Sequence, residues 1–391
     1  MSLIPELKIV AETPSKLPAV QCRRMLVGPG VNEPNPFPGY NGFVGWEAVT
    51  RLKSGTWLVT FNAGYWHASP PVQQIFNNAL PWIVKAPTGG RAMIIRSTDE
   101  GVTWSHPETL VDTPEDDRHP SIIELPDGSL ICTFFTYNEE RNSEGEIARS
   151  DARTHIIRST DSGLTWSDPE RLNTGFTRDA TDGPIIILND GSMLLAIYGK
   201  NESDEHYKLG VMRSTDCGRT WKMLSTIETD HSLEEPGIAQ LPNGRLVMIA
   251  RPWADVCFSD DGGNTWTKPT PICMGKLSIF ACNLLCLENG ILLCIHGNYG
   301  TYGGLYAILS ADGGRTWLSP SRKYGFAVDT TVYGYAHPII LPDGSIFAVY
   351  IDNQGIRMDQ VEREAVWGVR MRVREDLSGI EMLPAPGVRM P

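Results

Sequence analysis

The amino-acid sequence predicts an all-β protein with the fold of a six-bladed β-propeller. Three observations predict this fold: a motif that occurs five times, a second motif that occurs six times, and a composition rich in turn residues. The 38 Gly and 28 Pro of the 391-residue chain favour many short strands over long helices, because both residues interrupt regular structure.

The first repeat has the pattern S-x-D-x-G-x-T-W. Its five copies begin at Ser97, Ser159, Ser214, Ser259 and Ser310. In each copy the Asp carboxylate can accept backbone N–H bonds within a turn, the Gly supplies a positive φ, and the Trp packs beneath the turn. We therefore expect these Asp residues to be structural.

The second repeat is a hairpin of two apolar strands, as in ELPDGSLIC and QLPNGRLVM. Its turn glycines, 46 to 73 residues apart, are Gly55, Gly128, Gly191, Gly244, Gly290 and Gly344. Each hairpin but the last precedes a copy of the first repeat, so each pair of repeats predicts one four-stranded blade. We expect the outer strands of the sixth blade at Ala365–Val373 and near Leu7–Ala11. Residues 1–391 would then form one domain, its ring closed by both ends of the chain.

The composition narrows the classes of partner. The formal charge of −12 argues against a nucleic-acid partner, which needs a basic surface, and no apolar run is long enough to cross a membrane. The eight cysteines show no paired framework, which predicts small buried hydrophobes and fits a cytoplasmic location. A secreted protein that has lost its signal peptide is the alternative. No metal-ligand spacing or phosphate-binding motif is present, so we expect neither a metal nor a cofactor. The oligomeric state is left open.

Candidate functional residues follow from the register of the hairpins. Residues nine before and seven after a turn glycine should meet at one end of the hairpin. The positions nine before hold Trp46, His119, Asp182, Glu235, Ala281 and Tyr335, and those seven after include Asn62 and Arg251. Glu47 and His337 lie beside these positions. So many polar groups at the ends of apolar strands predict a binding or catalytic site, and a channel lined by satisfied polar residues is the alternative.

The fourth hairpin carries the sharpest pair of candidates. Glu235 and Arg251 flank the turn at Gly244, so they should lie side by side. The planar guanidinium of Arg251 suits a substrate carboxylate, and a plain Glu–Arg ion pair is the alternative. In the sixth hairpin, Tyr335 is a candidate nucleophile that needs a neighbouring base, for which Glu235 is placed. A core tyrosine is the alternative.

The S-x-D-x-G-x-T-W motif, called an Asp box, and its place in the blades resemble the sialidase (neuraminidase) superfamily over nearly the whole chain. The resemblance implies a propeller whose site lies on the face opposite the Asp boxes. It also implies that Glu235 assists Tyr335 as nucleophile and that Arg251 binds the substrate carboxylate.

The sequence departs from the sialidase pattern at several positions. Trp46 lies near the place of the first of three carboxylate-binding arginines, and Tyr302 lies near the place of the third. Asn62 occupies the register of the acid/base Asp. These departures argue against ordinary sialidase chemistry. His119 or Asp182 would then supply the acid, and Asp182 or Glu47 could pair with Glu235 as the two carboxylates of a glycosidase.

Further candidates lie close to these positions. The stretch DDRHP puts Arg118 beside His119, and a long insertion after Asn62 offers Trp66 as a stacking surface. We expect the polar stretch Asn138–Arg149 to form a rim loop.

We predict a glycoside hydrolase that acts on an acidic or non-standard sugar, with a carbohydrate as its partner. In this reading Arg251, Glu47, Arg118, His337, Asn62 and Trp66 bind the substrate, and Glu235, Tyr335, His119 and Asp182 are catalytic. A uronate lyase, in which tyrosine and histidine exchange protons, is one alternative. A non-catalytic propeller that binds a glycan or a protein is the other.

Overall fold

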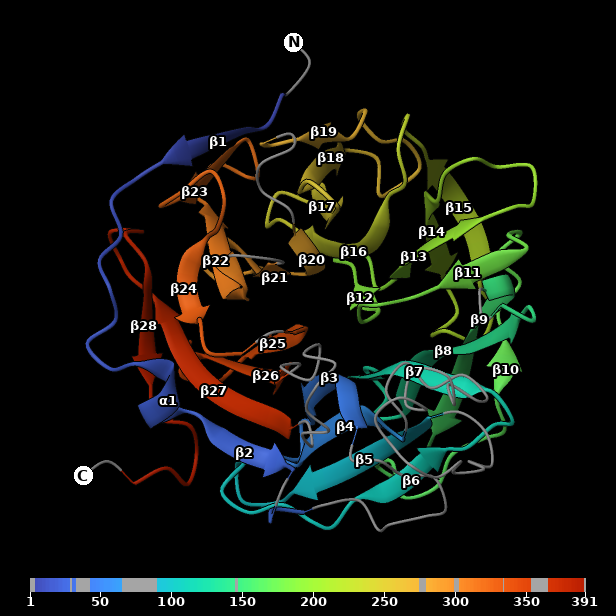
Figure 1. The fold of residues 1–391 in the computed structure, drawn as a ribbon, viewed down its shortest axis with the longest axis horizontal. Coiled ribbons are helices and arrows are strands. Elements are labelled where there is room, and N and C mark those ends of the chain that lie inside the picture. The colour runs from blue at the N-terminus through green and yellow to red at the C-terminus, as the bar shows by residue number, and fades with distance from the viewer. Residues whose placement is uncertain are drawn as a thin grey trace. The chain divides into compact units, whose positions relative to one another are not determined.

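The structure is a computed structural model that describes residues 4–28, 30–32, 43–64, 90–144, 147–273, 279–298, 302–332, 334–352 and 365–389. In these ranges the only helix is the short α1 (Ala19–Cys22), and no helix is long and apolar enough to cross a membrane. The strands form six sheets of four to six strands each (Figure 1). The predicted fold class, an all-β six-bladed propeller, is therefore confirmed.

The chain divides into two compact units. Unit 1 comprises Met1–Arg24, Asn173–Ala348 and Val369–Pro391, and unit 2 comprises Met25–Leu172 and Val349–Gly368. The organisation of the whole chain as a single domain stays a prediction.

Unit 2 contains two complete antiparallel sheets whose strands pair in chain order. The first sheet consists of β3 (Phe43–Arg51), β4 (Trp57–Gly64), β5 (Arg91–Ser97) and β6 (Glu108–Val111). The second sheet consists of β7 (Asp116–Glu124), β8 (Leu130–Arg141), β9 (Ile147–Ser159) and β10 (Glu170–Arg171).

The expected rim loop Asn138–Arg149 lies largely within the second sheet. Strands β8 and β9 continue into it, with Asn138 opposite Asp151 and Glu140 opposite Arg149. The prediction of a loop was wrong because polar side chains do not prevent pairing in a two-stranded ribbon, where the backbone groups satisfy one another.

Unit 1 contains three further sheets. The third sheet consists of β11 (Arg178–Ala180), β12 (Ile186–Ile187), β13 (Met193–Lys200), β14 (Lys208–Ser214) and β15 (Lys222–Ile227). The fourth consists of β16 (Glu234–Gln240), β17 (Leu246–Arg251), β18 (Asp255–Ser259) and β19 (Thr270–Pro271). The fifth consists of β20 (Ile279–Cys286), β21 (Leu292–Asn298), β22 (Gly304–Ser310), β23 (Thr316–Ser319), β24 (Phe326–Asp329) and β1 (Glu6–Ile9).

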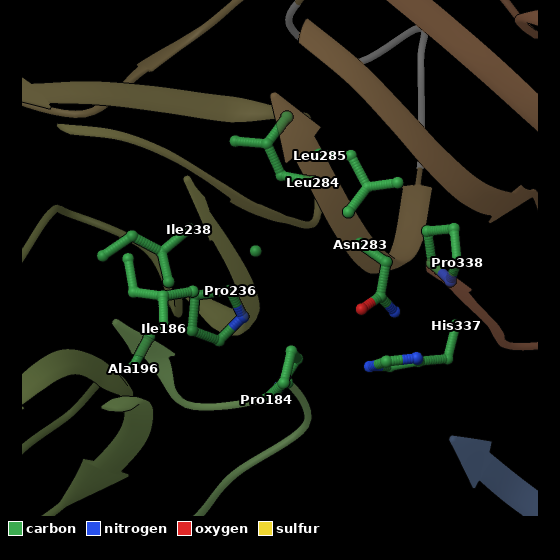
Figure 2. A pocket seen from close by; sticks show the side chains of 12 residues that line it. Pro184, Ile186, Ala196, Pro236, Ile238, Asn283, Leu284, Leu285, His337 and Pro338 are labelled. Carbon is green, nitrogen blue, oxygen red and sulfur yellow. The ribbon is translucent and has the colours of Figure 1, made fainter. Parts of the chain in front are cut away.

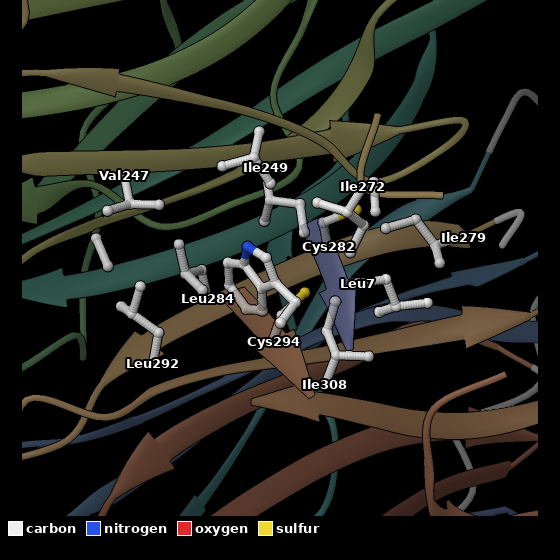
Figure 3. Packing of buried hydrophobic residues seen from close by; sticks show 14 of the residues in the cluster. Leu7, Val247, Ile249, Ile272, Ile279, Cys282, Leu284, Leu292, Cys294 and Ile308 are labelled. Carbon is white, nitrogen blue, oxygen red and sulfur yellow. The ribbon is translucent and has the colours of Figure 1, made fainter. Parts of the chain in front are cut away.

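The sixth sheet and the N-terminal strand differ from expectation. The sixth sheet consists of β25 (Ala336–Ile340), β26 (Ile346–Asp352), β27 (Ala365–Val373), β28 (Ile380–Leu383) and β2 (Arg24–Val27). The stretch Leu7–Ala11 was expected in this sheet, and that prediction was wrong. Strand β1 instead lies parallel to β23, with Leu7 opposite Trp317. Leu7 joins the apolar cluster of the fourth and fifth sheets there, and burial of its side chain favours that place (Figure 3).

The turns of both repeats have the predicted geometry. The six turn glycines of the hairpins have φ values between 74° and 89°. In each Asp box the Asp binds the turn from within: Asp99, for example, accepts bonds from the backbone N–H and the hydroxyl of Thr103 at 2.8 and 2.6 Å. These hydrogen bonds lower the pKa of Asp99 to about 2. The Asp of the box therefore has a structural role in the turn, as expected.

The cysteines mostly behave as small buried hydrophobes, as predicted. All eight are free thiols, and six of them are buried. Cys282 and Cys294 pack with Trp317 and Ile249 in the cluster between the fourth and fifth sheets (Figure 3). Close packing of this kind holds neighbouring blades of unit 1 together and fixes the strand ends that carry the candidate site.

Candidate active site

The first strands of four hairpins share one irregularity. The pairing register shifts in β3, β7, β16 and β20. Within the shifts, positive φ values of 49°, 53°, 47° and 51° occur at Trp46, His119, Glu235 and Ala281. These are four of the six positions nine residues before a turn glycine. A bulge turns a side chain away from the regular alternation of side chains between the two faces of a strand. Counting nine residues back from the turn glycine therefore finds the same bulge in four hairpins.

In unit 1, the bulge of β16 carries a carboxylate that three groups hold. Glu235 is 4% exposed. Its Oε1 accepts hydrogen bonds from Nη1 of Arg251 and from the hydroxyl of Tyr335, both at 2.7 Å. Its Oε2 accepts the backbone N–H of Ala281 at 2.8 Å. The three side chains that the sequence predicted to converge are therefore in direct hydrogen-bond contact.

The ionisation of Glu235 follows from these contacts. Burial raises its pKa, but the charge of Arg251 and the hydrogen bonds from Tyr335, Ala281 and Arg251 outweigh burial, so the pKa lies below its usual range. Glu235 is therefore a carboxylate at neutral pH. In this state it is an acceptor for the phenol proton of Tyr335.

Two neighbours extend the electrostatic environment of Glu235. Glu234 lies 3.6 Å from Nη2 of Arg251, and burial raises its pKa. Tyr198, at the end of β13, has a pKa well above its usual range because of burial and the nearby charges of Glu235 and Glu234. Tyr198 therefore stays a neutral phenol. Sequence reasoning assigned no role to Glu234, although the doublet EEP was a visible signal.

Asp182 and His337 are both in unit 1, and the cavity that His337 lines is also lined by Gly183 and Pro184, which directly follow Asp182. Asp182 lies in the connection between β11 and β12, and its charge helps to raise the pKa values of Tyr198 and Cys282, as does that of Glu235. This cavity is mainly apolar and has a volume of about 90 Å³, and His337 lies in it beside Asn283 (Figure 2). Burial lowers the pKa of His337 to about 4, so its ring is neutral at pH 7. Its predicted contact with a substrate stays a prediction.

In unit 2, the bulge of β7 carries a closely packed cation. Nε of Arg118 donates to Oδ2 of Asp116 at 2.6 Å, and both side chains are buried. The guanidinium lies 4.7 Å from the ring centre of Trp46 and 4.1 Å from that of Tyr137. Ion pairing and two aromatic faces give Arg118 a structural explanation, and its role toward substrate stays a prediction.

The other candidates of unit 2 are also buried. The ring of His119 stacks between Trp46 and Phe135 at 5.2 and 5.3 Å. Asn62 donates to the backbone carbonyl of Asp117, and Glu47 is 5% exposed. Trp66 lies outside the described residues. In the part of the chain that the structure describes, no three His, Cys, Asp or Glu side chains gather as metal ligands would.

Known proteins resemble this chain in sequence and in fold. The sequence profile of the BNR repeat-like domain matches residues 94–320, more than half of the chain. A sialidase from Paraclostridium sordellii is 26% identical over 202 residues, which are 45% of this chain and 49% of the sialidase. The chain thus spans about half the length of the curated sialidases that it matches.

Two solved structures share the fold over most of the chain. A protein of unknown function from Dyadobacter fermentans superposes with a TM-score of 0.67 at 18% identity, covering 92% of this chain and all of that protein. The intramolecular trans-sialidase from Ruminococcus gnavus superposes with a TM-score of 0.60 at 14% identity, covering 91% and 98% of the two chains. At these identities the likeness shows the fold alone. Together with the sequence match, it shows that this chain belongs to the BNR repeat-like family of the sialidase superfamily.

Proposed function

We propose that the protein is a glycoside hydrolase that forms a covalent intermediate on Tyr335 and acts on an acidic or non-standard sugar. One observation carries this proposal: the hydroxyl of Tyr335 donates to the ionised Glu235 at 2.7 Å. A free phenol titrates near pH 10 and is a weak nucleophile, and an adjacent base removes that obstacle.

The geometry supports a definite sequence of proton and bond changes. The phenol proton of Tyr335 passes to Oε1 of Glu235 while the phenol oxygen bonds to the anomeric carbon. The bond from that carbon to the leaving oxygen breaks, and the leaving oxygen takes a proton from an acid, for which Asp182 is the candidate in unit 1. Water then attacks the anomeric carbon and gives a proton to the deprotonated acid, while the bond to Tyr335 breaks and its phenolate takes back the proton from Glu235. Two displacements leave the sugar with its original configuration.

Arg251 has two parts in this proposal. Its side chain is 28% exposed while that of Glu235 is 6% exposed, so a ligand meets the guanidinium before the carboxylate. An anionic group that binds Arg251 would weaken its ion pair with Glu235 and raise the pKa of Glu235. Glu235 would thus become a stronger base when an acidic substrate binds. The guanidinium would therefore select an anionic sugar and also adjust the base.

The test is hydrolysis of aryl glycosides by the wild type, Glu235→Gln and Tyr335→Phe. The panel contains the sialoside, several uronides and the rhamnoside. We expect release of the aryl group from one sugar, reduced about 10²- to 10⁴-fold in Glu235→Gln and lost in Tyr335→Phe. A fluorinated analogue of that sugar should leave its mass on the peptide that contains Tyr335.

Matched variants separate catalysis from folding. Tyr306→Phe removes another buried tyrosine hydroxyl of unit 1, and Glu100→Gln removes a carboxylate paired with Arg51 at the surface. Both should keep full activity. Full activity in Tyr335→Phe would end the proposal. Silence of the folded wild type across the panel would favour the lyase, if a polyuronate is cleaved with a new double bond, or the binding propeller, if it is not.

A further inference from the structure

Strands β11 and β13 of the third sheet place two cations directly opposite each other. Arg178 on β11 pairs with Lys200 on β13 in the antiparallel register. Residues directly opposite each other present their side chains on the same face, where like charges repel. The pair therefore concentrates positive charge on one face of the third sheet.

Both cations approach one aromatic ring. The centre of the Tyr207 ring lies 5.0 Å from Nζ of Lys200 and 5.6 Å from Cζ of Arg178. The backbone of Tyr207 is tied to the segment before β16, because its carbonyl accepts the N–H of Leu233 at 3.0 Å and its N–H donates to Ser232 at 3.1 Å. The cluster Arg178–Lys200–Tyr207 is therefore anchored beside the strand that carries Glu235.

Glu234 connects this cluster to the candidate active site. Burial raises the pKa of Glu234, and the charges of Arg251, Arg178 and Lys200 act against that rise. Glu234 also lies 3.6 Å from Arg251. The carboxylate of Glu234 thus interacts electrostatically with Arg251 and with both cations of the cluster.

Lys200 keeps an ammonium without a carboxylate at ion-pair distance among the residues that the structure describes. The carboxylate of Asp204 feels its charge, but Asp204 is bound to Lys208 at 2.9 Å. The side chains of Arg178, Lys200 and Tyr207 are all half-buried, so a ligand can reach them.

The fold itself does not require two cations here. Counted from the turn glycines, the corresponding positions hold Glu115 and Tyr137 in the second sheet. In the fourth sheet they hold His231 and Trp253, whose rings lie 4.7 Å apart. Of these three sheets, only the third carries a cation pair at these positions.

We propose that Arg178, Lys200 and Tyr207 form a subsite for a second anionic group, carboxylate or sulfate, of an acidic oligosaccharide. The inference rests on the proposed function, since the reactive sugar would occupy the neighbouring site at Glu235, Arg251 and Tyr335. The substrate is then an oligosaccharide with acidic residues in sequence. The cations bind the anionic group, and the ring of Tyr207 offers an apolar face to the sugar.

The test measures binding in the Glu235→Gln background, so that turnover plays no part. Titration calorimetry compares an unsulfated chondroitin tetrasaccharide, its sulfated form, tetragalacturonate and the neutral cellotetraose. We expect an acidic tetrasaccharide to bind more tightly than cellotetraose. Adding Arg178→Met and Lys200→Met should weaken the binding of the acidic tetrasaccharide about tenfold to a hundredfold. The salt dependence of its binding should also decrease. The sulfated and unsulfated forms distinguish a sulfate ligand from a carboxylate ligand.

Lys222→Met is the matched control, because Lys222 is an exposed lysine of the same sheet. It should bind like the parent, and thermal melting should show that all variants fold. Three results would each overturn the subsite. The first is that adding Arg178→Met and Lys200→Met leaves binding of the acidic tetrasaccharides unchanged. The others are that the parent binds cellotetraose as tightly as the acidic tetrasaccharides, or that it binds none of the probes. Hydrolysis of the aryl glycosides by the wild type tests the proposed function separately, since each of these substrates carries a single sugar that does not reach the subsite.

Discussion

The hairpins β7–β8 of unit 2 and β16–β17 of unit 1 share a backbone bulge and differ in chemistry. Each first strand has a register shift with a positive-φ residue, His119 in one and Glu235 in the other. In β7 the neighbouring cation, Arg118, is enclosed by Trp46 and Tyr137. In β17 the cation, Arg251, keeps an exposed edge.

The difference shows how a repeated fold can use one backbone feature for stability in one hairpin and for catalysis in another. A buried ion pair with aromatic faces on both sides adds specific packing, and breaking it leaves a charge without a partner. A carboxylate that is held by a phenol and by a partly exposed guanidinium is placed for proton transfer. The β16–β17 hairpin is therefore the better candidate for catalysis, and the β7–β8 hairpin is the better candidate for stability.

The largest expected effect separates the two candidate acids. Asp182→Asn should lower turnover of substrates with poor leaving groups about 10²- to 10⁴-fold, and far less with good leaving groups, which need no protonation. His119→Gln should change turnover less than tenfold, because its ring is stacked between two aromatic rings. Rates measured across aryl leaving groups of different acidity check both. A leaving-group dependence confined to His119→Gln would reverse the assignment.

The next effect compares the stability of the two ion pairs. Arg118→Met should cost about 3–5 kcal/mol, since it leaves Asp116 buried without its cation. Arg251→Met should cost less, about 1.5–3 kcal/mol, because the side chain of Arg251 is 28% exposed and that of Arg118 only 8%, so solvent screens the Arg251 pair more. Urea unfolding of each variant measures this. The double variant Asp116→Asn with Arg118→Met should recover part of the loss, and no recovery would contradict the pairing.

A third effect is the pH dependence of stability. Burial raises the pKa of Asp117 to about 7 in the folded state, against about 3.9 when unfolded. The folded state therefore binds more protons between these values, and stability falls as the pH rises through this window, by up to about 1.4 kcal/mol per pH unit. Asp117→Asn should flatten that slope in urea unfolding.

Glu235 should behave in the opposite sense, which provides the control for that experiment. Its folded pKa is lowered, so its contribution to stability is present at neutral pH and is lost on acidification. Glu235→Gln should leave unchanged the fall in stability that occurs as the pH rises toward 7. The same slope in the wild type and in Asp117→Asn would show that another group causes it.

The smallest effect is expected in the Asp boxes. Asp216→Asn loses part of the hydrogen bonding to Thr220 at the surface, so melting should fall by a few degrees at most. Hydrolysis of the best aryl glycoside should be unchanged, because the carboxylate serves the turn. A large loss of activity with normal melting would give the Asp boxes a role in the chemistry.

Local features of the fold could be predicted from the sequence because their causes are local. The turn at Gly244 and the box around Asp99 depend on residues within a few positions, which a repeat displays directly. The place of Leu7 could not be predicted in this way. It depends on Trp317, more than three hundred positions away in the sequence.

The sequence by itself determined the six hairpins, the Asp-box turns and the positions at which side chains leave the strand ends. Only the tertiary structure decided which of these side chains meet. Tyr335 and Glu235 are 100 residues apart, and the N–H of Ala281 reaches Glu235 from another sheet. Packing of neighbouring blades brings these groups within hydrogen-bond distance, and burial with Arg251 sets the pKa of Glu235. Neither effect is contained in the spacing of residues along one hairpin, because distance and dielectric environment arise only when the sheets pack.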